Sequence, residues 1–164
     1  MTEEEASADL ATLYARPGFL LRRAHQIATS VFLAETAAHG LATPSQFGAL
    51  LILRARPGLD QAGLARMLGL DRSTTGLVVA KLHGAELLDR RVRPGDRRRH
   101  ELRLTARGMD LLARLEPAAR AVEDAVLAPF TAEERKQFLH LLGKFVAAHN
   151  AHVRIPMHPA GAGD

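Results

Sequence analysis

The stretch that decides the fold covers residues 59–104 and reads LDQAGLARMLGLDRSTTGLVVAKLHGAELLDRRVRPGDRRRHELRL. Asp60 is a good N-cap for a short first helix, and Gly69 suits a tight turn. Asp71 can cap a second helix, which we expect Gly84 to break. The pattern therefore predicts a helix-turn-helix.

A basic β-hairpin, or wing, is predicted directly after it. Apolar residues alternate there with charged ones, at Leu88, Val92, Leu102 and Leu104, and Pro94-Gly95 suits the turn. Residues 89–107 hold eight Arg against three acidic residues, so this segment carries the basic excess of a chain whose net charge is +4. A local cationic patch on a near-neutral body is expected for a polyanion partner. A solvated Arg-rich loop is the alternative.

The second helix of the pair divides by phase into two faces. At about 100° per residue, the inward side is formed by Thr75, Val78, Val79 and Leu82. The candidate DNA contacts lie near its start and on the opposite side, at Arg72, Ser73, Thr74, Leu77 and Lys81. Short hydroxyls near the helix start suit base edges or phosphates, the cations suit phosphates, and Leu77 suits a thymine methyl. Alternatively, Ser and Thr are present only because the first helical turn tolerates them.

The wing adds a second group of candidate DNA contacts, Arg93, Asp96, Arg97, Arg98 and Arg99. A narrow minor groove attracts inserted Arg side chains. Asp96 lowers the local positive charge, so we expect it to hold Arg97 or Arg98 in a fixed pose by a bidentate pair.

The rest of the chain predicts further helices around this unit. We expect a flexible acidic arm at residues 1–16 and helical regions at 17–43 and 105–150. A disordered tail is expected at 151–164. We expect helix caps at Thr43, Thr105 and Thr131. Pro117 falls inside the penultimate helix and should bend or split it.

Several classes of function are excluded by what the sequence lacks. The absence of Cys removes disulfides and thiolate metal sites, and His140, His149 and His152 have no acidic partner nearby to complete a metal site. There is no Gly-rich phosphate loop, catalytic triad order or pair of facing carboxylates, so we expect neither an enzyme nor a cofactor. No apolar run reaches about 18 residues, and the N-terminus is acidic, so we expect a cytoplasmic protein.

The motifs together resemble the MarR family of winged-helix transcription regulators over residues 17–150. The resemblance is carried by LARMLGLD at 64–71, RSTTGL at 72–77, LHGAELL at 82–88, DRR at 96–98 and LTARG at 104–108. It implies a mainly α fold with a small β-wing, with residues 44–104 as the DNA-binding region and the flanking helices interlocked in a homodimer. Each subunit would place one helix in the major groove and one wing in the minor groove of a near-palindromic operator. Leu77 departs from the family, where many relatives have a polar or basic residue.

A small-molecule effector is also implied by the resemblance. The run RPGFLLRRAHQI at 16–27 is similar to family members linked to aromatic-acid breakdown, which suggests Arg16, Arg22 and His25 as effector-binding residues. Arg22, His25 and Thr29 share one helical stripe, where a cation and an imidazole beside apolar surface suit an aromatic carboxylate. Alternatively, Arg22 is solvated or paired across a dimer, and His25 is a satisfied interface histidine.

The sequence thus predicts a dimeric DNA-binding regulator, a repressor released by a small aromatic acid or its thioester. The alternative is a winged-helix module whose Arg-rich wing binds an acidic protein, without an effector.

Overall fold

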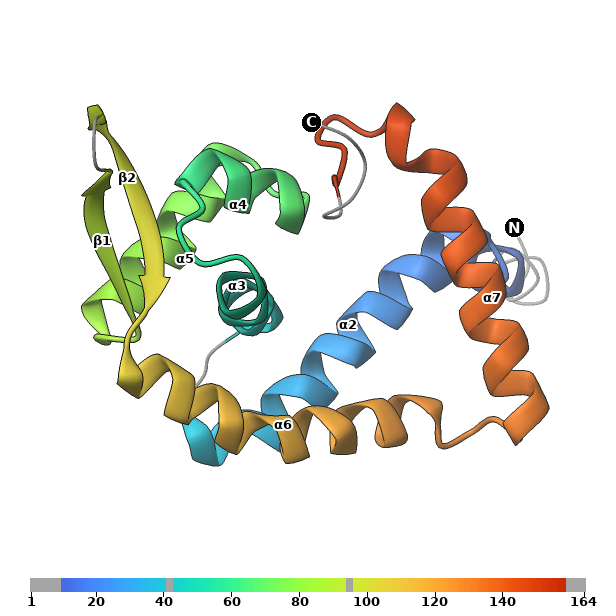
Figure 1. Cartoon of the computed structure of the whole chain (residues 1–164). Helices are drawn as coiled ribbons and strands as arrows, with labels where there is room; N and C mark the ends of the chain where they lie inside the picture. The colour runs from blue at the N-terminus through green and yellow to red at the C-terminus, as the bar shows by residue number, and fades with distance from the viewer. Residues whose placement is uncertain (1–9, 41–42, 94–95, 159–164) are drawn as a thin grey trace.

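The computed structural model describes residues 10–40, 43–93 and 96–158 (Figure 1). A short helical segment at residues 10–14 precedes the elements α2 (Pro17–Thr36), η1 (Ala37–His39), α3 (Pro44–Ala55), α4 (Gln61–Leu68), α5 (Arg72–Gly84), β1 (Leu88–Arg93), β2 (Asp96–Leu104), α6 (Ala106–Leu127), α7 (Ala132–His149) and η2 (Asn150–His152). The predicted class, mainly α with a small β-wing, is confirmed. Within the described ranges, no helix has the length and apolarity needed to cross a membrane.

Helices α3 to α7 all begin at the predicted capping residues. In each, the side chain of the N-cap accepts a hydrogen bond from the backbone N–H three residues later, and these caps are Thr43, Asp60, Asp71, Thr105 and Thr131. Gly69 ends α4 in the left-handed conformation at φ 64°, which favours glycine. The boundaries of the helix-turn-helix therefore follow from local hydrogen bonding.

The hydrophobic core is formed by α3, the helix-turn-helix, the base of the wing and the first half of α6. Its fully buried large side chains include Leu50, Leu53, Leu64, Val79, Leu82, Leu88, Leu102, Leu112 and Leu115. In contrast, α7 contributes no buried residue. Figure 1 shows α7 on the opposite side of the molecule from β1 and β2.

The wing is an antiparallel hairpin anchored at its base. Leu88 pairs with Leu104, and Arg93 pairs with Asp96 beside the turn. The loop before α4 adds backbone bonds to β2, from Gly58 N to Leu102 O at 3.0 Å and from Leu102 N to Leu59 O at 2.8 Å. These bonds fix one end of the hairpin to the helix-turn-helix and leave the other end to project.

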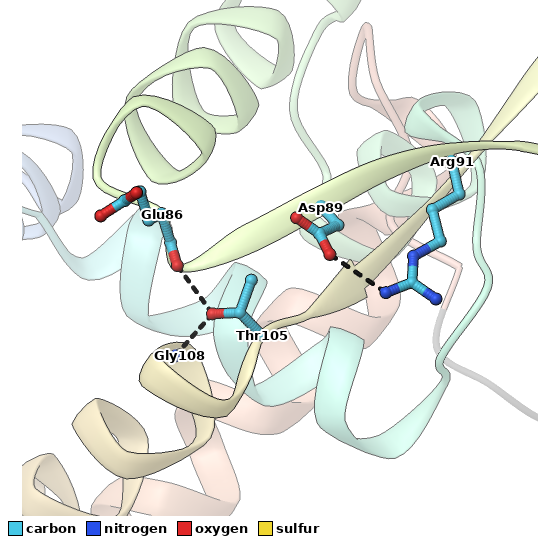
Figure 2. Close-up of polar contacts among 5 residues, drawn as sticks. All are labelled: Glu86, Asp89, Arg91, Thr105 and Gly108. Carbon is cyan, nitrogen blue, oxygen red and sulfur yellow. Dashed lines mark hydrogen bonds and ion pairs between the residues drawn. The ribbon is translucent and has the colours of Figure 1, made fainter.

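The junction between α5, β1 and α6 is built around Thr105 (Figure 2). Its hydroxyl donates to Glu86 O at 2.7 Å and accepts from Gly108 N at 3.0 Å. Helix α5 ends at Gly84, as the sequence predicted, and the chain reverses two residues later at Glu86, with φ 60°. The hydrogen bond that Glu86 accepts from Thr105 holds this conformation, which L-residues rarely adopt.

The C-terminal half differs from expectation at two points. Of the two outcomes expected at Pro117, a split does not occur, because α6 is a single helix from Ala106 to Leu127. The tail beyond residue 150 was expected to be disordered, but its described part, 151–158, follows a defined course. The Asn150 side chain exchanges two 2.8 Å hydrogen bonds with the backbone of Met157, and His158 N donates to Arg66 O at 2.9 Å. These tertiary bonds hold the tail against the end of α4.

Candidate nucleic-acid interface

Helix α5 has the two faces that its sequence predicts. Thr75, Val78, Val79 and Leu82 are buried, which confirms the inward side. On the outer side, Arg72, Ser73 and Lys81 are exposed, and Thr74 is half-buried. Leu77 is 66% exposed, the most of any large apolar side chain in the described residues. The helix therefore presents a free outer face to a partner.

Asp71 organises the start of this face. Its Oδ1 accepts hydrogen bonds from Ser73 Oγ at 2.6 Å and from Thr74 N at 2.7 Å, and its Oδ2 accepts from Thr74 Oγ1 at 2.8 Å. The bond from the Ser73 hydroxyl, followed by those from Thr74, holds the pKa of the Asp71 carboxyl well below its usual range. Asp71 is therefore ionised at neutral pH, and both hydroxyls are oriented toward it.

Cations flank these hydroxyls along α5. Arg72 is exposed, and its carbonyl oxygen accepts from Gln61 Nε2 at 3.4 Å, which ties the start of α5 to α4. Lys81 lies nine positions after Arg72, roughly 14 Å along the helix axis. The two cations therefore suit phosphate contacts at either end of the outer face.

The wing carries further exposed Arg residues. Arg90 and Arg91 are exposed on β1, and Arg91 forms a 3.2 Å ion pair with Asp89 (Figure 2). The predicted contacts Arg93, Asp96, Arg97, Arg98 and Arg99 belong to the strands, but their side chains lie outside the described part of the structure. The predicted pairing of Asp96 with a neighbouring Arg therefore remains a prediction.

The tail adds a cation that the sequence reasoning missed. Arg154 and Ile155 line a depression of about 450 Å³ together with residues of the helix-turn-helix, which include Arg66, Asp71 and Arg72. Arg154 is more than 80 positions from Arg72 in the chain, so no local pattern could have placed them at one depression. The only sequence signal was a basic residue in a Pro-containing tail.

The three predicted effector residues lie at or near the start of α2 and are all exposed in the single chain. The Arg22 guanidinium packs over the ring of Phe19, with Cζ 4.7 Å from the ring centroid. Arg16 is the N-cap position of α2, and His25 lies one helical turn beyond Arg22. The three depressions described in the structure are lined by other residues. Within the described residues, these three side chains are therefore not enclosed.

A large apolar surface is left uncovered on α7. Its exposed apolar side chains are Leu139, Leu141, Leu142, Phe145 and Val146. Helix α2 carries exposed apolar side chains of its own, at Leu20, Leu21, Ile27 and Leu33. Large exposed apolar patches mark protein–protein interfaces.

Comparisons with known proteins agree with the resemblance to MarR family regulators. Residues 42–100 match the model of the MarR family. The chain is 34% identical over 129 residues to the HTH-type transcriptional repressor NicR of Pseudomonas putida, which covers 79% of this chain and 81% of that protein.

Two solved structures have the same fold. One is the transcriptional repressor CouR bound to a 23-mer DNA duplex, with a TM-score of 0.75 and 34% identity over 82% of this chain and 94% of that one. The other is the MarR family protein Rv2887 of Mycobacterium tuberculosis in complex with salicylic acid. It has a TM-score of 0.64 and 33% identity over 80% of this chain and 96% of that one.

The helix-turn-helix, the free outer face of α5 and the anchored wing define a winged-helix DNA-binding protein. With these similarities, the chain belongs to the MarR family of transcription regulators. The sequence left open whether the partner is DNA or an acidic protein. Membership of this family favours DNA.

Proposed function

We propose that this protein is a dimeric repressor that binds a near-palindromic operator and is released by a small aromatic acid or its thioester. The observation that carries the proposal is the free outer face of α5, set opposite four buried residues and beside an anchored wing. Its relatives include a repressor bound to a DNA duplex and a protein bound to salicylic acid.

In the major groove, Ser73 and Thr74 read base edges, and Leu77 contacts a thymine methyl or covers the base of the helix. Arg72 and Lys81 contact phosphates on either side. In the minor groove, the wing contributes Arg93, Arg97, Arg98 and Arg99, with Asp96 positioning one of them. The placement of each residue on α5 or on the hairpin supports these roles.

The dimer is formed by the terminal regions, residues 17–43 and 105–150. A second copy would cover the apolar surface of α7. No residue of α7 is buried in the single chain. Two-fold symmetry then places two α5 helices on half-sites about one helical turn of DNA apart.

The effector site uses Arg16, Arg22 and His25. All three are exposed in the single chain and close to the apolar surface of α2, so the proposed site becomes enclosed only when a partner subunit packs there. A carboxylate would meet the Arg22 guanidinium, and its aromatic ring would lie on apolar surface. The ligand releases DNA by favouring a dimer in which the α5 spacing no longer matches the groove. We further propose that the protein acts in the cytoplasm and catalyses no reaction.

The test is to select duplexes from a randomised pool and to measure their affinity by fluorescence anisotropy over a range of salt. We expect one near-palindromic sequence to bind best and the affinity to fall steeply with salt, by a logarithmic slope of about 0.9 per phosphate contacted. Salicylate, other aromatic acids and their thioesters are then added to the complex. Equal affinity for all duplexes would overturn the DNA function, and an unchanged affinity with every acid and thioester would overturn the effector.

A further inference from the structure

The start of α5 fixes the direction of two hydrogen bonds that face the proposed groove. Ser73 Oγ and Thr74 Oγ1 each lie within 2.8 Å of an Asp71 carboxylate oxygen. Asp71 is the N-cap of α5, and its Oδ1 also accepts from Thr74 N. Three donors therefore converge on one side chain at the start of this helix.

An ionised carboxylate has no hydrogen to donate, so both hydroxyls must be the donors in these contacts. Each hydroxyl has a single hydrogen, and that hydrogen is directed at Asp71. The oxygen atoms keep lone pairs for other partners. Toward the solvent, Ser73 and Thr74 therefore present hydrogen-bond acceptors.

This polarity restricts what the two residues can bind on DNA. Phosphate oxygens only accept hydrogen bonds, so hydroxyls that have donated to Asp71 cannot contact them directly. In the major groove, the donors on the base edges are the N6 amino group of adenine and the N4 amino group of cytosine. Each base pair has one such amino group in the major groove, on its adenine or its cytosine. An acceptor at Ser73 or Thr74 therefore distinguishes base pairs by the strand that carries this group.

We propose that Asp71 is a specificity-determining positioning residue, which makes Ser73 and Thr74 read adenine or cytosine amino groups in the major groove. This inference rests on the proposed function, in which α5 lies in that groove. It goes beyond that function by assigning the two hydroxyls to one chemical class of base edge, the amino groups of adenine and cytosine.

The substitution Asp71→Asn separates this role from helix capping. Asn is as good an N-cap as Asp, so α5 should keep its start. Its Oδ1 can still accept from Ser73 Oγ and Thr74 N, whereas an amide nitrogen replaces Oδ2. That nitrogen donates to Thr74 Oγ1, and the Thr74 hydroxyl then directs its own hydrogen outward. The variant converts Thr74 to a donor and leaves Ser73 an acceptor.

The experiment uses the full chain and the duplex that it selects from a random pool. Each adenine of a half-site is replaced in turn by purine, and each cytosine by pyrimidin-2-one, which deletes the amino group. Thr74→Val identifies the position read by Thr74, and Ser73→Ala identifies that read by Ser73. Because every protein is tested on the same duplexes, effects of the analogues on DNA itself cancel. Thermal unfolding of each variant shows that the fold is kept.

For the unaltered chain, we expect deletion of the amino group opposite Thr74 to weaken binding about tenfold, which corresponds to about 1.4 kcal/mol. Asp71→Asn should lose less than about twofold at that position and keep its sensitivity at the position read by Ser73. Equal losses in both proteins at the Thr74 position would overturn the proposal. So would an operator on which no amino deletion under α5 weakens binding. If no duplex is selected at all, the proposed DNA function itself has failed.

Discussion

Gly108, in the first turn of α6, lies directly against the backbone carbonyl oxygen of Leu87. A Cβ at Gly108 would overlap that oxygen more closely than real Cβ contacts allow. Leu87 O also accepts a 3.1 Å hydrogen bond from Thr105 N. The approach of α6 to the start of β1 therefore depends on a residue without a side chain, at the point where α6 leaves the wing.

Gly108→Ala should force α6 and the base of the wing apart. The atom met by the new methyl group is backbone and cannot rotate away, so we expect a loss of about 2 kcal/mol or more in the free energy of unfolding. Urea denaturation measures this loss. Operator affinity should fall as well, because the displaced junction holds the wing.

Gly84→Ala is the matched control, since Gly84 is helical and a Cβ there meets nothing within 4 Å. This variant should be unchanged or slightly more stable, because Ala favours a helix over Gly. If both variants unfold at the same urea concentration, the close approach of Gly108 to Leu87 is not required for stability.

The sequence predicted those features that depend on local hydrogen bonding and on helical phase. The caps at Asp60 and Asp71 and the turn at Gly69 are decided within a few residues of chain, so they could be identified from residue type and spacing alone. The inward face of α5 followed from periodicity, since burial of an amphipathic helix repeats every 3.6 residues.

Features that depend on contacts between distant segments could not be predicted. The chain reverses at Glu86 rather than at Gly84 because Thr105, 19 positions later, donates to its carbonyl oxygen. The tail is ordered by Asn150 and by its contact with Arg66, which no local pattern reports. Ser73 and Thr74 were recognised as groove-facing, but the direction of their hydroxyls required the distances to Asp71.

The wing should contribute affinity without affecting assembly. Arg97→Ala and Arg98→Ala are each expected to weaken operator binding about tenfold and to leave the dimer intact by sedimentation, since they remove charge from a projecting hairpin. Arg114→Ala, on the exposed side of α6, removes the same charge outside the wing and should leave the affinity unchanged. Unaltered binding in both wing variants would remove the wing from DNA recognition.

Arg22→Ala should abolish the response to an aromatic acid and preserve operator binding, because it removes the cation that would meet the carboxylate. The measurement is release of labelled operator by salicylate, or by the most effective acid of a panel. Arg23→Ala is the control, since the adjacent Arg23 side chain donates instead to Gln26 at 3.3 Å. A normal response from the Arg22 variant would show that the effector binds elsewhere.

Asn150→Ala should release the tail from the helix-turn-helix. It removes both hydrogen bonds to Met157, each worth about 1 kcal/mol, so local opening should rise by roughly tenfold or more. Trypsin cleavage after Arg154 should accelerate accordingly. Asn150→Asp keeps the acceptor for Met157 N and loses the donor, so an intermediate rate is expected. Equal cleavage rates in all three proteins would show that these bonds do not hold the tail.

Acid should destabilise the fold through its helix caps, and the Thr131–Glu134 capping box of α7 offers a direct test. The Glu134 carboxylate accepts hydrogen bonds from Thr131 N and from Thr131 Oγ1, both at 2.8 Å, and these bonds lower the pKa of Glu134. A carboxyl whose pKa is lower in the folded state stabilises that state at neutral pH. The stabilisation is lost as the pH falls below the pKa of about 4.3 in the unfolded state and then through the lower pKa of the folded state.

Glu134→Gln should therefore lower the urea midpoint at pH 7 and reduce its fall between neutral and acidic pH. Glu133→Gln removes a charge from the same helical turn without touching the capping box, and it should keep the acid dependence of the unaltered chain. The measurement is the urea midpoint of each protein from pH 7 down to about pH 3. The expected pH dependence comes from ionised Glu134, which the Gln variant lacks. If all three proteins gave parallel pH profiles, this carboxylate would not contribute to acid unfolding.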